Sequence, residues 1–180
     1  MVDIPQSRAI NFSNAFVNNT TRADVTNADF KQFWVYGDYQ NDALWVDVFN
    51  NVKVSGASVG SSATWTPEET AYWQVNKTYN FGAYADGTSQ LTTGILYEPA
   101  SKTLTFSDYS AGANDLIAAT SSDVSWDGSV DPAKVQLSFK HMLSKVKFTF
   151  KTDAVETYTM KVSGLKISQA IQTATGTMVN

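Results

Sequence analysis

The 180-residue sequence has no cysteine and a single histidine, His141. Without cysteine the chain can form no disulfide framework, thiol nucleophile or thiolate metal site. The histidine is not accompanied by a glycine-flanked serine motif, which would indicate a nucleophilic triad, or by a carboxylate cluster that would complete a metal site. We therefore expect a non-enzymatic protein with no bound metal and no other cofactor.

Basic side chains are also few. The chain carries 13 Lys and Arg against 17 Asp and Glu, which gives a net charge of -4 and a pI near 4.8. Nucleic acids are bound through basic patches, so we expect no nucleic-acid partner. No apolar run reaches the roughly 18 residues that a membrane span needs, and the N-terminus lacks the basic-then-apolar pattern of a signal peptide. Met1 fits either a native start or a start that replaced a removed leader.

Most of the sequence consists of short segments in which apolar and polar residues alternate. Hydrophobic residues make up 43% and charged residues 17%, which is typical of a folded globular domain. Apolar and polar residues alternate in many short stretches separated by turn residues, and no long amphipathic helix interrupts them; at most, residues 66–69 form one helical turn. This pattern predicts an antiparallel β-sandwich with strands within 7–12, 30–36, 44–49, 52–54, 79–85, 91–97, 104–106, 114–120, 135–150 and 157–167.

Some of these segments carry more specific predictions. Residues 30–36 carry apolar side chains at both odd and even positions, which indicates a strand packed on two sides. Asn50-Asn51 is a turn signal, so a hairpin is expected there. The run 114–120 fits a strand or a helix, and its short length favours a strand. Residues 121–132 are expected to form a loop.

The longest strand signal, 135–150, changes its parity once. Val135, Leu137 and Phe139 lie on odd positions, whereas Phe148 and Phe150 lie on even ones. A β-bulge near residue 144 would keep both sets on the core face. A tight turn there, giving two strands, is the alternative.

Few residues suggest binding or processing. Trp65 and Trp126, which we place in loops, are candidates for stacking on a glycan, although tryptophan is first of all a core residue. His141 is expected to be hydrogen-bonded inside the sandwich or at its rim. In the polar stretch 18–24, Arg22 is accessible to a trypsin-like protease, or it is an ordinary solvated loop residue.

Several motifs occur together in a characteristic order. They are Tyr-Trp at 72–73, the aromatic strand 79–85, Asp-Leu-x-x-Ala at 115–119 and Phe-x-His-x-Leu-Ser-Lys-Val at 139–146. Over about residues 10–167 this combination resembles the fimbrillin family of Bacteroidales surface proteins. The resemblance implies a transthyretin-like Greek-key β-sandwich in a subunit of type V pili or a related surface adhesin. It also implies an extracellular location, fimbrial subunits as partners, and a lipid anchor in the outer membrane.

The resemblance further implies proteolytic activation. In pilins of the family a protease cuts after an arginine in the early loop, which corresponds to the bond between Arg22 and Ala23. The cut would remove a first strand containing Ile10 and Phe12 and open a groove for a neighbour's donor strand. The expected organisation is a removable segment at 1–22, a sandwich domain at 23–168 and a tail at a domain boundary, 169–180. The alternative is a surface-anchored module that binds a glycan or host protein without polymerising.

Overall fold

The computed structural model describes residues 8–16, 30–56, 60–112, 114–144, 148–151, 161–166 and 173–179. None of the described residues forms a helix that is long and apolar enough to cross a membrane. The described strands are β1 (Phe12–Phe16), β2 (Gln32–Asn41), β3 (Leu44–Gly56), β4 (Gly60–Pro67), β5 (Thr78–Asp86), β6 (Ile95–Glu98), β7 (Thr103–Ser110), β8 (Leu116–Ser125), β9 (Val135–His141) and β10 (Thr173–Val179).

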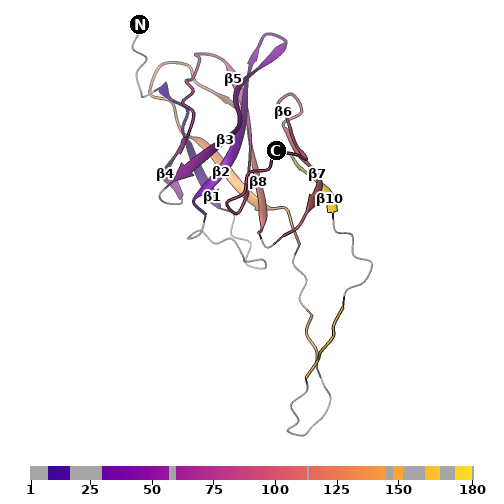
Figure 1. The fold of residues 1–180 in the computed structure, drawn as a ribbon. Coiled ribbons are helices and arrows are strands. Elements are labelled where there is room, and N and C mark those ends of the chain that lie inside the picture. Colours follow the sequence, from indigo (N-terminus) through magenta and orange to yellow (C-terminus); the bar gives the residue numbers. More distant parts are fainter. Residues whose placement is uncertain are drawn as a thin grey trace.

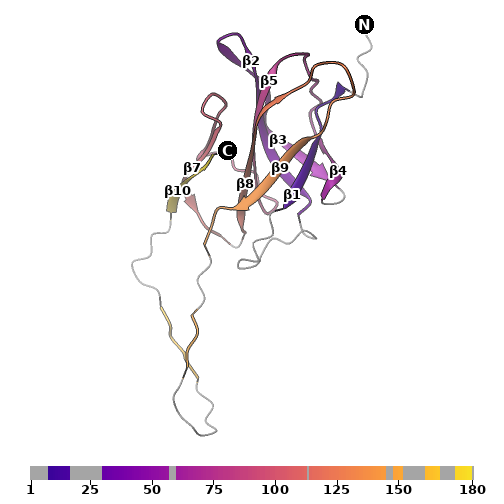
Figure 2. The same cartoon turned by 180° about the vertical axis from the view of Figure 1, so that it is seen from behind.

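The strands form a closed barrel and a smaller sheet. The barrel order is β1-β4-β3-β2-β5-β8-β9, and the second sheet has the order β10-β7-β6 (Figures 1 and 2). The all-β prediction is therefore confirmed. The two layers of an antiparallel Greek-key sandwich are not clearly present, because β1 pairs with both β4 and β9 and closes the larger sheet on itself. Its pairing with β9 is parallel, so the larger sheet is not purely antiparallel either.

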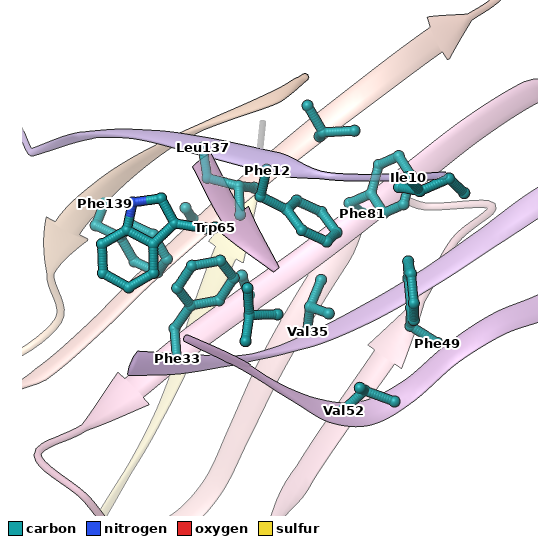
Figure 3. Packing of buried hydrophobic residues seen from close by; sticks show 14 of the residues in the cluster. Ile10, Phe12, Phe33, Val35, Phe49, Val52, Trp65, Phe81, Leu137 and Phe139 are labelled. Carbon is teal, nitrogen blue, oxygen red and sulfur yellow. The ribbon is translucent and has the colours of Figure 1, made fainter. Parts of the chain in front are cut away.

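Two hydrophobic clusters lie on opposite faces of β2. Phe33 and Val35 point into the barrel core, whereas Trp34 and Tyr36 pack in the cluster beneath the small sheet. The prediction of a strand packed on two sides is confirmed here. The barrel core is dominated by aromatic rings, several of which Figure 3 shows packed together.

The hairpin expected at Asn50-Asn51 is wrong. β3 runs without a break through this position, and the chain instead turns between Asn41 and Leu44. Asn51 has a positive φ of 56°, and the β2–β3 register shifts at this point, so β3 has a bulge there. Asparagine tolerates the left-handed conformation of a bulge as readily as that of a turn, which is why the sequence signal was ambiguous.

The run 114–120 forms a strand from Leu116 onward, as its length indicated, but β8 continues to Ser125. The loop expected from residue 121 is therefore wrong over its first five positions. Asp123 has a φ of 57°, and the β5–β8 register shifts between Tyr79 and Phe81. This bulge interrupts the alternation on which the strand prediction relied.

The stretch 135–150 does not form the single bulged strand that we expected. β9 ends at His141, and residues 148–151 belong to no strand. The two-strand alternative is not observed in the described residues either, and 145–147 lie outside them. Residues 161–166, expected in a last strand, also form none, and 152–160 and 167 lie outside the description. By contrast, β10 lies within the predicted tail, where Thr, Ala and Gly gave no clear alternation.

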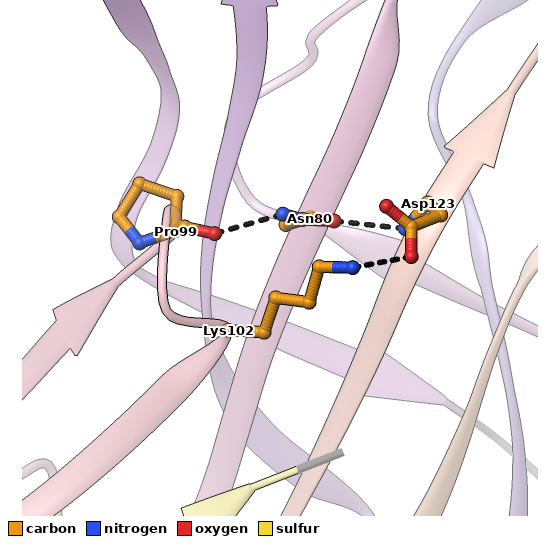
Figure 4. Close-up of polar contacts among 4 residues, drawn as sticks. All are labelled: Asn80, Pro99, Lys102 and Asp123. Carbon is orange, nitrogen blue, oxygen red and sulfur yellow. Dashed lines mark hydrogen bonds and ion pairs between the residues drawn. The ribbon is translucent and has the colours of Figure 1, made fainter.

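A buried polar side chain attaches the small sheet to the barrel. Asn80 on β5 donates a hydrogen bond to the carbonyl of Pro99 and accepts one from the amide of Asp123, each 2.8 Å long. Lys102 forms an ion pair with the Asp123 carboxylate (Figure 4). Asn80 therefore hydrogen-bonds a backbone amide in the β8 bulge and a backbone carbonyl in the β6–β7 turn. These two bonds hold the small sheet against the barrel.

Candidate functional site

The first strand closes the barrel, and it is hydrogen-bonded along both sides. Phe12–Phe16 pairs in parallel with Val135–Phe139 of β9 and, with a register shift, with β4 on the other side. Just before β1, the amide of Ile10 donates to the carbonyl of Ala71 at 2.9 Å. Residues 8–16 are therefore an integral part of the barrel backbone, and we call them the first-strand segment.

Two side chains of this segment fill the barrel core. Ile10 and Phe12 are 1% and 0% exposed, respectively. The Phe12 ring lies 5.9, 5.8 and 5.6 Å from the rings of Phe33, Phe49 and Phe81, with centroid distances and tilts suited to edge-on aromatic contact (Figure 3). Burial of a phenylalanine stabilises a fold by about 1.5–3 kcal/mol, so the segment is held by side chains as well as by its backbone.

The first-strand segment lies between β4 and β9, and without it the space that it fills would be a groove. Its walls include Trp65 on β4 and Val135, Leu137 and Phe139 on β9, all of which are buried. Phe139 packs on Phe30, with 5.0 Å between ring centroids. A chain without the segment would expose this apolar surface together with the unpaired backbone groups of both strands. Such a site binds an extended strand whose apolar residues lie two positions apart.

The barrel core contains an ionisable tyrosine. Tyr79, on β5, lies beside Trp73, with ring centroids 4.6 Å apart. Burial raises the pKa of Tyr79, and the hydrogen bond that its hydroxyl oxygen accepts from the Gln74 amide partly offsets this.

Both candidate tryptophans are buried, but only Trp65 lies in a strand, whereas Trp126 lies in the expected loop after β8. Trp65 belongs to β4 and is fully buried, so its placement in a loop was wrong and its ring has no exposed face in this structure. Trp126 directly follows β8, and its indole nitrogen donates to the carbonyl of Val130. The Arg8 guanidinium lies 5.5 Å from the centre of its ring, a cation–π contact that anchors the start of the first-strand segment.

The other predicted residues are placed as follows. Arg22 and Ala23 lie outside the described residues, between the end of β1 and the buried Phe30. His141 contacts the Asp115 carboxylate with little exposure of either side chain, so the prediction of a hydrogen-bonded histidine is confirmed. No group of three or more potential metal ligands occurs among the described residues.

Sequence reasoning identified Ile10 and Phe12 but missed the strands that receive them. β4 and β9 are distant from β1 in sequence, and the parallel pairing with β9 joins residues more than a hundred positions apart. No local pattern specifies such a pairing, because alternation indicates that a segment is a strand and not which neighbour it takes.

Comparison with known proteins adds to this geometry. The model of the fimbrillin-like family matches residues 21–180, so the first-strand segment precedes the matched region. No curated protein and no solved structure matches the chain significantly. The family is structural and non-enzymatic, and it suggests a fimbrial subunit at the cell surface that associates with other subunits. The earlier resemblance is thereby confirmed: the chain belongs to the fimbrillin-like family.

Proposed function

We propose that the protein is a structural subunit of a cell-surface fimbria that assembles by donor-strand exchange after cleavage between Arg22 and Ala23. One observation carries the proposal. The first-strand segment closes the barrel between β4 and β9, and its Ile10 and Phe12 side chains are completely buried. A neighbour's strand that takes its place would restore the same hydrogen bonds and apolar contacts.

The proposed cleavage site suits this role. The bond lies after β1 and before β2, so a cut there would leave the first-strand segment attached only by hydrogen bonds, packing and the Arg8 contact with Trp126. The free energy of strand exchange is then favourable only if the apolar side chains of the incoming strand pack at least as well as Ile10 and Phe12 do. Cleavage would convert a covalently attached strand into a replaceable one.

The proposal includes the finer points that the family resemblance implies. Residues 1–22 are removed, and residues 23–168 form a domain related to transthyretin-like sandwiches. A domain boundary lies within 169–180, and the protein is exported as a lipoprotein that is anchored in the outer membrane. The partners are then further fimbrial subunits, and no catalytic step by the protein is required.

Cleavage with an arginine-specific protease tests the proposal. Arg8 and Arg22 are the arginines of the sequence, so an Arg8→Lys chain keeps the positive charge near Trp126 and can be cut only after Arg22. We expect this chain to be cut, to stay folded, and to form multimers once the 1–22 fragment is released. An Arg8→Lys, Arg22→Gln chain is the matched control: it should stay uncut, and treatment with the protease should leave its state of association unchanged.

Two results would contradict the proposal. One is resistance of the folded chain to cleavage after Arg22. The other is a cut chain that unfolds, or that forms no multimers after losing its 1–22 fragment. A cut chain that stays folded without assembling would favour the binding-module alternative.

A further inference from the structure

Four of the exposed large apolar side chains of the described residues gather in two short segments. Residues 148–151 and 161–166, which we call the arm, extend away from the barrel and cross one another in both views (Figures 1 and 2). Phe148 and Phe150 are each 53% exposed, and Val162 and Leu165 are 49% and 57% exposed. No other phenylalanine whose exposure the structure describes is exposed to this degree. Clustered exposure of this kind marks an interaction surface.

The backbone of the arm is also available for pairing. Neither of its segments takes part in a strand or in any strand pairing among the described residues. Phe148 and Phe150 alternate with polar residues, which is the pattern of a strand that buries one face. The arm can therefore add to an open sheet edge, where both its backbone and its apolar face would be satisfied.

The charge of the arm points to the partner. All its charged residues are lysines, Lys151, Lys161 and Lys166, and none pairs with a described carboxylate. The whole chain has a net charge of -4, so the rest of the molecule is acidic. The arm and the body of this chain are thus electrostatically complementary, which favours contact between two copies.

β6 is the edge that fits the arm best. Among the described strands it pairs only with β7, so no described strand covers its other side, and its length of four residues matches segment 148–151. It presents Leu96, which is 56% exposed, and the exposed carboxylate of Glu98, whose described contact is a 3.4 Å hydrogen bond from the Ser101 hydroxyl. The opposite edge, β10, carries no acidic residue. Glu98 on the exposed face of β6 is therefore a counterpart for Lys151, and the half-buried Ile95 and Tyr97 on its other face are counterparts for the phenylalanines.

We propose that the arm of one copy docks on the β6 edge of a second copy, with Lys151 beside Glu98 on the exposed face of β6 and Phe148 and Phe150 on the opposite face, beside Ile95 and Tyr97. The two contacting surfaces differ, so the contact is head-to-tail and can repeat along a filament. The contact uses neither the β1 groove nor cleavage at Arg22. Failure of this contact would leave the strand-exchange proposal intact, and the reverse also holds.

Self-association of the uncut full chain tests the docking. We expect sedimentation velocity to show concentration-dependent association that weakens as salt is raised, because exposed charges are screened. Phe148→Ser with Phe150→Ser, Glu98→Lys, and Lys151→Glu should each raise the apparent Kd by about tenfold or more. Val130→Ser, at another exposed apolar position, is the matched control and should change nothing.

A mixing experiment identifies the two halves of the contact. The Glu98→Lys chain keeps an intact arm, and the Lys151→Glu chain keeps an intact edge, so an equimolar mixture should associate where each variant alone does not. An uncut chain that stays monomeric at all concentrations would overturn the proposal. It would equally be overturned by association that the arm or edge variants leave unchanged, or by a mixture that fails to recover it.

Discussion

The first-strand segment and the arm contain the same kind of sequence in opposite surroundings. Ile10 and Phe12 alternate with polar residues, as do Phe148 and Phe150. The first pair is completely buried between β4 and β9, whereas the second pair is half exposed and has no strand partner in the described structure. Alternation thus makes a segment able to join a sheet, and the presence of an open edge decides whether it does.

This contrast assigns different roles to the two segments. The first-strand segment completes the folded unit, so its side chains contribute to stability. The arm lies outside the folded unit, so its side chains should contribute to association. Between these extremes lies the small sheet, which has open edges of its own but is fixed to the barrel by Asn80. Stability measurements on matched variants separate the three cases.

Truncation in the barrel core should have the largest effect. Phe12→Ala removes a ring that contacts Phe33, Phe49 and Phe81, and leaves a cavity in a closed core. We expect the free energy of unfolding to fall by about 3–5 kcal/mol, measured by urea denaturation of the uncut chain. A loss below about 1 kcal/mol would show that the first strand is not part of the core.

Removal of the buried amide should have an intermediate effect. Asn80→Ala leaves the Asp123 amide without its partner and leaves the Pro99 carbonyl with only the 3.3 Å hydrogen bond from the Lys102 amide, so we expect the free energy of unfolding to fall by about 1–3 kcal/mol. Lys102→Met is the matched control, because it removes only the partly exposed ion pair of the same cluster and should cost under about 1 kcal/mol. Equal losses in the two variants would contradict the proposed role of Asn80.

A like-charge pair on the barrel gives a smaller, pH-dependent effect. Burial, and then the Asp47 carboxylate directly opposite on β3, raises the pKa of Asp38 from 3.8 to about 6. The folded state therefore holds this proton more tightly than the unfolded state, and stability is lost as the pH rises from about 4 to above 6. Because Asp38 is partly exposed, solvent screening reduces the loss to about 1 kcal/mol.

Asp38→Asn isolates this contribution. The variant should be more stable than the parent chain at pH 8 by about 1 kcal/mol and should lose that advantage near pH 3, as thermal unfolding at several pH values would show. Asp42→Asn, which removes an exposed carboxylate from the neighbouring β2–β3 turn, is the control. If the difference in stability between the Asp38→Asn variant and the parent chain stayed the same from pH 4 to pH 7, this account would be contradicted.

Truncation on the arm should have the smallest effect on stability. Phe148→Ala removes a half-exposed ring without described strand partners, so the free energy of unfolding should stay within about 0.5 kcal/mol of the parent value. Denaturation at a low protein concentration, where copies do not associate, is the appropriate measurement. A loss close to that of Phe12→Ala would show that the arm packs on the barrel and would erase the contrast.

The sequence predicted the strands better than it predicted how they are joined. Composition and alternation indicated an all-β fold, the two-sided burial of 30–36 and the apolar faces of Ile10 and Phe12. Bulges at Asn51 and Asp123 were misread because a left-handed residue gives the same signal in a bulge and in a turn. Barrel closure through β1 and β9 depends on contacts between distant residues, and no local pattern encodes it.

The most direct test of the central claim is exchange of the first strand itself. An Arg8→Lys chain cut after Arg22 is mixed with a fluorescent peptide of residues 1–22, and binding is followed by anisotropy. If the strand is replaceable, the cut chain takes up the labelled peptide, unlabelled peptide competes, and a Phe12→Ala peptide competes far less well. The uncut chain should bind none. A folded cut chain that takes up no peptide, or equal competition by the Phe12→Ala peptide, would contradict the account.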